Sequence, residues 1–230
     1  MTSAQKQEKP HYSGHRDRLR QRFVQGGSNA LQDYELLELI LFMAIPRRDV
    51  KPLAKDLIQK FGSFAGVMHA AIPELIENGL SENTAIALKT IESSALKMIH
   101  QDIEKKPILN SWSRLIDYLY ASMAHETKEQ FRLLFLNKKN ELIADEVQQT
   151  GTIDHTPAYP REIMKSALNI GATAIILVHN HPSGDPTPSK PDIALTQEII
   201  AAAKPFNVVI HDHIIISKNG YTSFKSEGLI

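Results

Sequence analysis

Two histidines that follow a short apolar run are the residues of this sequence best suited to chemistry. His179 and His181 come at the end of residues 174–178, a run so short and β-branched that it predicts a buried strand rather than a helix. Side chains at positions i and i+2 of a strand point to the same face, so both imidazoles can reach one point. A turn rich in Pro, Ser and Gly follows, and Ser189 and Asp192 then open the next predicted helix. Two imidazoles and a carboxylate at the end of a buried strand form a zinc-like ligand set.

Ser189 and Asp192 also have a purely structural interpretation. The spacing Ser-x-x-Asp before apolar residues fits an N-terminal capping box, with Asp where Glu is usual. The two interpretations are compatible, because a cap that fixes the first helical turn would also aim Asp192 at the histidines. An isolated His-x-His is weak evidence for a metal, since buried histidines often simply satisfy a hydrogen bond. The joint pattern is what favours a metal site.

The elements that position these residues follow from hydrophobic periodicity. A helix is predicted from residue 112 to about 125, and from residue 131 onward the pattern changes to strands. The predicted order is β-β-α-β-α-β-β, and Asn219-Gly220 marks the last hairpin. Before residue 105 the sequence predicts only helices, preceded by a polar tail. We therefore expect a helical domain at 1–105 and an α/β (α+β) domain at 106–230, divided near Lys105-Lys106-Pro107.

Composition narrows the functional classes. Of 230 residues, 42% are hydrophobic, which is typical of a globular core. The formal net charge is zero, so the chain as a whole has no electrostatic bias toward nucleic acid. The absence of cysteine excludes disulfides and thiolate metal sites. We expect no secretory signal, because the N-terminal residues lack an apolar h-region, and the longest apolar-rich run, 36–45, is too short to span a bilayer. A cytoplasmic location is compatible with these features, and no membrane partner is expected.

The stretch from His179 to Asp192 resembles the JAMM (MPN+) metalloprotease motif, and it is similar to the bacterial RadC-like (UPF0758) family. The similarity covers nearly the whole chain. It is carried by these further segments: Asp33-Tyr-Glu-Leu-Leu-Glu-Leu, Ile45-Pro-Arg-Arg-Asp-Val-Lys-Pro-Leu-Ala-Lys, Glu129-Gln-Phe-Arg-Leu-Leu-Phe-Leu, Gly151-Thr-Ile-Asp, Tyr159-Pro-Arg-Glu-Ile and Asp212-His-Ile-Ile-Ile.

The resemblance implies a helix-hairpin-helix-like N-terminal domain followed by a JAMM/MPN-type (cytidine-deaminase-like) mixed sheet flanked by helices. It also implies a zinc metalloprotease-type hydrolase that acts on peptide or isopeptide bonds of an unknown substrate. One Zn²⁺ per chain would be bound by His179, His181 and Asp192, with water in the fourth position. Glu129 would be the general base, although Glu141 and Glu146 lie nearby, and Ser189 would donate to the oxyanion.

Other interpretations remain open in the sequence. His211-Asp212-His213 predicts either a second metal site or, as we favour, residues that support the first site or the fold. The alternative function is a DNA-associated, repair- or recombination-related protein whose helical domain binds DNA weakly and whose metal domain has an accessory or non-proteolytic role. The predicted hairpin at 78–81 has one glycine instead of the usual two, so a role in packing alone is at least as well supported. A non-catalytic MPN-type interaction module ranks last, and a homodimer through an exposed edge strand is a further expectation.

Overall fold

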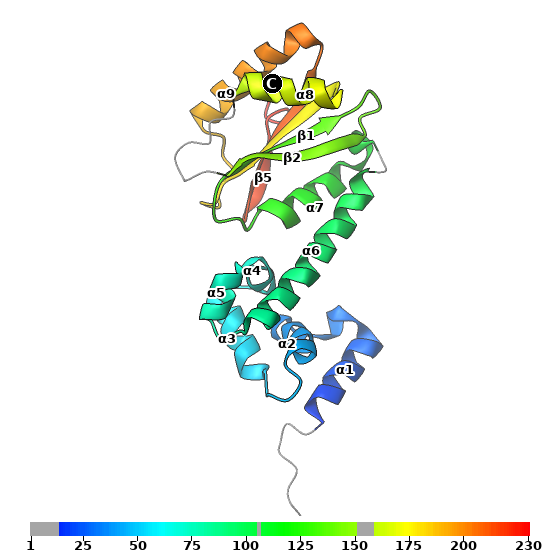
Figure 1. Cartoon of the computed structure of the whole chain (residues 1–230), viewed down its shortest axis with the longest axis vertical. Helices are drawn as coiled ribbons and strands as arrows, with labels where there is room; N and C mark the ends of the chain where they lie inside the picture. The colour runs from blue at the N-terminus through cyan, green and yellow to red at the C-terminus, as the bar shows by residue number, and fades with distance from the viewer. Residues whose placement is uncertain (1–13, 105–106, 151–158) are drawn as a thin grey trace, which may run out of the picture. The chain divides into compact units, whose positions relative to one another are not determined.

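The computed structural model describes residues 14–104, 107–150 and 159–230 (Figure 1). The predicted N-terminal tail, the predicted domain boundary at 105–106 and the segment 151–158, which begins with Gly151-Thr-Ile-Asp, lie outside these ranges. The chain divides into two compact units, residues 1–93 and 94–230, which are described in turn. No helix among the described residues has both the length and the apolar character needed to cross a bilayer.

The first unit is helical, as the sequence predicts. The side chains of Leu37 and Leu41 in the second helix are fully buried and pack with Leu57, Leu75 and Leu88 into one core. Gly62 ends the third helix with a positive φ of 81°, which glycine adopts without steric cost. The helices are α1 (His15–Gly26), α2 (Asp33–Ala44), α3 (Lys51–Phe61), α4 (Phe64–His69), α5 (Ile72–Glu77) and the first part of α6 (Glu82–Glu104), with a 3-10 turn at Ser28–Ala30.

The second unit is a mixed sheet flanked by helices, and the order β-β-α-β-α-β-β is confirmed. The strands lie in the order β2-β1-β3-β4-β5; β3 and β4 run parallel and the other neighbours antiparallel. The elements are α7 (Trp112–Met123), β1 (Gln130–Leu136), β2 (Leu142–Thr150), α8 (Pro160–Ile170), β3 (Ala174–Asn180), α9 (Lys190–Ala203), β4 (Val209–Ser217) and β5 (Gly220–Ser223), with 3-10 turns at Ile108–Ser111 and Lys204–Phe206.

Helices cover both faces of this sheet. In Figure 1, α8 and α9 lie on one side and α7 lies on the other, where the C-terminal end of α6 joins it. Along β3, Ile176 and Val178 pack on the α7 side, whereas Ile175 and Leu177 pack on the α8–α9 side. A strand buried on both faces needs apolar residues at every position, which explains the uninterrupted apolar run. The same alternation directs His179 toward α8 and α9.

Candidate metal centre

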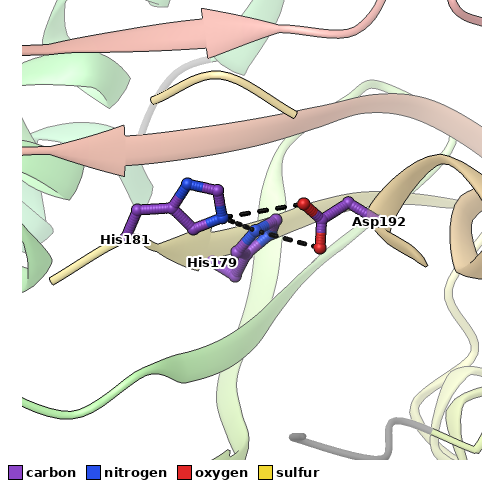
Figure 2. Close-up of side chains that lie close together, drawn as sticks. All are labelled: His179, His181 and Asp192. Atoms are coloured by element: carbon purple, nitrogen blue, oxygen red, sulfur yellow. Dashed lines mark hydrogen bonds and ion pairs between the residues drawn. The ribbon is translucent and has the colours of Figure 1, made fainter. Parts of the chain in front are cut away.

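The C-terminal end of β3 and the first turn of α9 bring three side chains together (Figure 2). His179 Nε2 lies 2.9 Å from His181 Nε2 and 3.5 Å from Asp192 Oδ1, and His181 Nε2 lies 3.6 Å from Asp192 Oδ2. Within the described part of the chain, this is the one group of three or more His, Cys, Asp or Glu side chains with ligand atoms close enough for a metal ion. His179 is the inner member at 2% side-chain exposure, while His181 and Asp192 are 18% and 17% exposed.

The spacing of these atoms suits a small tetrahedral ion. Ligand atoms about 2.0–2.1 Å from a tetrahedral metal lie about 3.3 Å from one another. The three observed separations, 2.9, 3.5 and 3.6 Å, bracket that value. Two imidazoles and one carboxylate are also a donor set that zinc accepts, and they leave one position open on the exposed side. The residues therefore fit a metal ion without a large movement of the backbone.

The predicted capping box is present and positions the carboxylate. Ser189 is the N-cap of α9: its Oγ accepts a hydrogen bond from Asp192 N (3.2 Å), and Asp192 Oδ2 accepts from Ser189 N (2.7 Å) and Ser189 Oγ (2.6 Å). Burial alone would raise the pKa of Asp192. The interactions with His181, His179 and Ser189 outweigh burial and hold this pKa well below its usual range. Asp192 is therefore ionised and ready to bind a cation.

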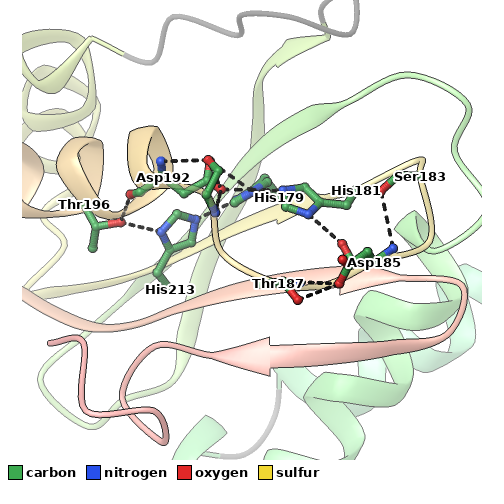
Figure 3. Close-up of polar contacts among 9 residues, drawn as sticks. His179, His181, Ser183, Asp185, Thr187, Asp192, Thr196 and His213 are labelled. Carbon is green, nitrogen blue, oxygen red and sulfur yellow. Dashed lines mark hydrogen bonds and ion pairs between the residues drawn. The ribbon is translucent and has the colours of Figure 1, made fainter.

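A chain of hydrogen bonds behind His179 fixes its tautomer (Figure 3). Thr196 Oγ1 donates to the carbonyl oxygen of Asp192 (2.6 Å), so it must accept from His213 Nδ1 (2.6 Å). Burial lowers the pKa of His213 well below its ordinary value, so its ring is neutral and its Nε2 is a bare acceptor. That Nε2 lies 2.8 Å from His179 Nδ1. His179 therefore carries its proton on Nδ1 and presents a lone pair on Nε2 to the centre.

His181 is oriented in the same way by the loop that follows it. Its Nδ1 lies 2.8 Å from the carbonyl oxygen of Asp185, which only accepts, so the Nδ1 proton points there and Nε2 faces the centre. Hydrogen bonding to Asp192 raises the pKa of His181, whereas burial lowers the pKa of His179 to about 4. The Nε2 atoms of both rings therefore face each other and the Asp192 carboxylate.

Glu129 lies close to this group, and the two alternative glutamates do not. It directly precedes β1, whose Phe131 pairs with His179, so continuing this antiparallel register places Glu129 opposite His181. Burial raises the pKa of Glu129, and the charges of His181 and Asp192 also act on it. Glu141 instead accepts a hydrogen bond from Asn137 in the β1–β2 turn, and Glu146 accepts one from Gln148 on β2.

The His211-Asp212-His213 cluster does not form a second metal group among the described residues. His213 supports His179, and Asp212 accepts hydrogen bonds from Ser223 Oγ (2.5 Å) and Lys225 N (3.0 Å), which hold the C-terminal segment. His211 Nε2 lies 2.7 Å from Asn140 Oδ1, away from the centre. The preferred interpretation of this cluster agrees with these contacts. Thr196 was missed in the sequence, where its spacing of four from Asp192 was the only available clue.

Two family models match the chain. The RadC-like JAB domain model matches residues 109–229, and the UPF0758 N-terminal model matches residues 13–86. The first range contains the sheet and all residues of the candidate centre, and the second contains most of the helical unit. The JAB match and the grouping of two histidines with an aspartate agree on a metal-dependent, hydrolase-like domain.

Proposed function

The chain belongs to the RadC-like JAB-domain family, and from this premise we propose that it is a zinc-dependent hydrolase that cleaves amide bonds of the peptide or isopeptide type. The observation that carries the proposal is the convergence of two imidazole Nε2 atoms and a carboxylate with a lowered pKa on one partly exposed point. His179, His181 and Asp192 would bind one Zn²⁺ per chain. When bound, zinc lowers the pKa of a coordinated water from ~15.7 toward ~7 and polarises a carbonyl group.

Glu129 would act as the general base. The best general base has a pKa near the working pH, and burial raises the pKa of Glu129 in that direction. A carboxylate opposite His181 can accept the proton of the attacking water and then deliver it to the leaving amine. The same group would therefore serve both half-steps, taking one proton from the water and giving it to the leaving amine.

Ser189 would stabilise the oxyanion, under one geometric condition. Its hydroxyl has a single proton, which here points at Asp192 Oδ2, 2.6 Å away. To donate to a developing oxyanion, that proton must turn away from the carboxylate. Asp192 keeps its hydrogen bond from Ser189 N (2.7 Å), so the capping box does not collapse when the hydroxyl turns.

The test is the metal content of the full chain purified without added metal. We expect about one zinc per chain in the wild type, and loss of zinc in His179→Ala. His211→Ala is the matched control, because His211 lies on β4 but contacts Asn140 rather than the centre; it should keep its zinc. A folded wild type that binds no zinc, even when zinc is supplied, would contradict the proposal. A zinc-loaded protein would then be screened against peptide and isopeptide substrates, with Glu129→Gln as the inactive reference.

A second candidate is weak DNA binding by the first unit. Arg47 and Arg48 line one hollow together with Gly79 and Ser81, next to the N-terminus of α6. Backbone N–H groups at a helix N-terminus and arginine side chains both suit phosphate groups. Binding of a labelled duplex by the full chain should fall steeply with salt and weaken in Arg47→Ala/Arg48→Ala. Arg161→Ala, an exposed change in the second unit, is the control. Salt-independent or absent binding would leave this surface with a packing role.

A further inference from the structure

Asn180 lies between the two histidines in sequence but faces the other side of the sheet. Its neighbours on β3 alternate, so His179 points toward α8 and α9 while Asn180 points toward the α7 side. The residue is only 1% exposed. A carboxamide buried to this extent must satisfy its donors and its acceptor within the protein.

The carboxamide of Asn180 binds the backbone on both sides of Glu129. Its Oδ1 accepts from Gln130 N (2.8 Å), and its Nδ2 donates to the carbonyl oxygen of Lys128 (3.1 Å) and, at 3.5 Å, to that of Glu126. Lys128 and Gln130 are the residues directly before and after Glu129. The contact therefore spans Glu129, whose charge interacts with His181 and Asp192 of the candidate centre.

The backbone pairing between β1 and β3 does not reach this far. Its last pair is Phe131 with His179. Beyond it, His181 N donates to Ile216 O of β4, and Pro182 has no N–H to donate. Beyond Phe131, the hydrogen bonds that hold the segment of Glu129 to the β3 strand therefore come from the side chain of Asn180.

We propose that Asn180 is a positioning residue that fixes Glu129 relative to the metal ligands. This inference rests on the proposed role of Glu129. We call the hydrogen bonds from the Asn180 carboxamide to Gln130 N and Lys128 O the clamp. Because Asn180 lies between His179 and His181, the clamp holds the backbone of Glu129 at a fixed position relative to these two proposed ligands. The clamp needs one donor and one acceptor at the end of a short side chain. A carboxamide supplies both, whereas aspartate supplies only the acceptor and leucine supplies neither.

The test compares Asn180→Leu and Asn180→Asp with the wild type, using Co²⁺ alone as the probe. Asn137→Leu is the matched control, because Asn137 Oδ1 also accepts two backbone hydrogen bonds, from Lys139 N (2.8 Å) and Glu141 N (3.1 Å), at the other end of β1. Two quantities are measured by NMR: the hydrogen-exchange rate of the Gln130 amide in the metal-free protein, and the paramagnetic shift of the Glu129 carboxyl carbon in the Co²⁺-loaded protein.

In Asn180→Leu we expect the Gln130 amide to exchange about tenfold faster or more, since its acceptor is lost. The Glu129 paramagnetic shift should fall markedly while Co²⁺ still binds one per chain. Asn180→Asp should retain Gln130 protection but still displace Glu129, and it keeps the test open if the leucine variant does not fold. Asn137→Leu should change neither quantity. A Glu129 shift that stays at the wild-type value in both Asn180 variants would overturn the proposal. Failure of the wild type to bind Co²⁺ would instead count against the proposed function, and Gln130 exchange in the metal-free protein would still decide whether the clamp exists.

Discussion

The hydrogen bonds that join Thr196, His213 and His179 form a relay on the far side of His179 from the candidate centre. Replacing Thr196 by valine removes one hydroxyl group from this relay and should weaken zinc binding. Thr196 is fully buried, and valine has nearly the same shape, so the change is mainly chemical. The hydroxyl accepts from His213 Nδ1 and donates to Asp192 O, both at 2.6 Å. Without it, the Nδ1 proton of His213 has no acceptor in the relay.

The protein can respond to this loss in two ways. If His213 keeps its tautomer, a buried donor is left unsatisfied, which costs about 1–3 kcal/mol. If the His213 proton moves to its Nε2, His213 becomes a donor to His179 Nδ1, 2.8 Å away. The proton of His179 is then forced onto the Nε2 of His179, the atom proposed to bind zinc. Zinc binding then has to restore the first tautomer against the same penalty. An affinity loss of about 5- to 150-fold follows, since 1.36 kcal/mol corresponds to a factor of ten.

The assay is competition for zinc against a chromogenic chelator at pH 7.5, where the carboxylate is ionised. Thr196→Ser should recover most of the affinity because it restores the hydroxyl. Thr173→Val is the control: Thr173 precedes β3, and its hydroxyl donates to Leu136 O (3.4 Å) away from the centre. A folded Thr196→Val protein that binds zinc within twofold of the wild type would refute the relay as the determinant of the His179 tautomer.

Four further outcomes are expected. Glu129→Gln should bind zinc normally while turnover of any peptide or isopeptide substrate falls by about 10²- to 10⁴-fold, and normal turnover would reject Glu129 as the base. Ser189→Ala should lower the free energy of unfolding in urea by about 0.5–2 kcal/mol because the N-cap of α9 is lost. Zinc affinity should fall about tenfold per pH unit below the raised pKa of His181, since a proton on His181 Nε2 competes with the metal. His179 has a pKa of about 4 and takes up a second competing proton only near pH 4. A zinc affinity that stays constant from pH 5 to 8 would contradict the expected competition. In the metal-free protein, the raised pKa of His181 stabilises the fold fully below about pH 6.5, and this stability is lost as pH rises through the folded-state pKa. The lowered pKa of Asp192 stabilises the fold above about pH 3.9, and this stability is lost as pH falls. Urea titrations at several pH values separate the two contributions.

The features that the sequence predicts correctly are those set by local rules. The order of strands and helices follows from hydrophobic periodicity, and the capping box at Ser189 follows from a spacing of three residues. The approach of His179 and His181 follows from the two-residue repeat of a strand. The approach of Asp192 to them requires only that α9 begin soon after β3 ends, which the intervening turn allows.

The relay through Thr196 and His213 lies beyond local rules, because it joins α9 to β4. Its members become neighbours only when β4 pairs in parallel beside β3 and α9 packs over both strands. A β-bulge adds a second difficulty. The pairs Ile175–Ile210 and Ile176–Asp212 leave His211 as an extra residue. An unbroken two-residue repeat would put His211 on the same face as His213, but the bulge interrupts the repeat, and His211 contacts Asn140 in the β1–β2 turn.

Asn180 shows that the two-residue repeat of a strand can also hide a residue that supports the site. The rule that groups His179 with His181 assigns the residue between them to the opposite face, where it would normally count as core. Yet a sheet is only one backbone thick, so a side chain on one face can bind the main chain of a residue whose own side chain lies on the other. Asn180 does this at 2.8 and 3.1 Å, on either side of Glu129. For a polar residue buried between two candidate metal ligands of a strand, the informative question is therefore which backbone groups it binds on the neighbouring strand.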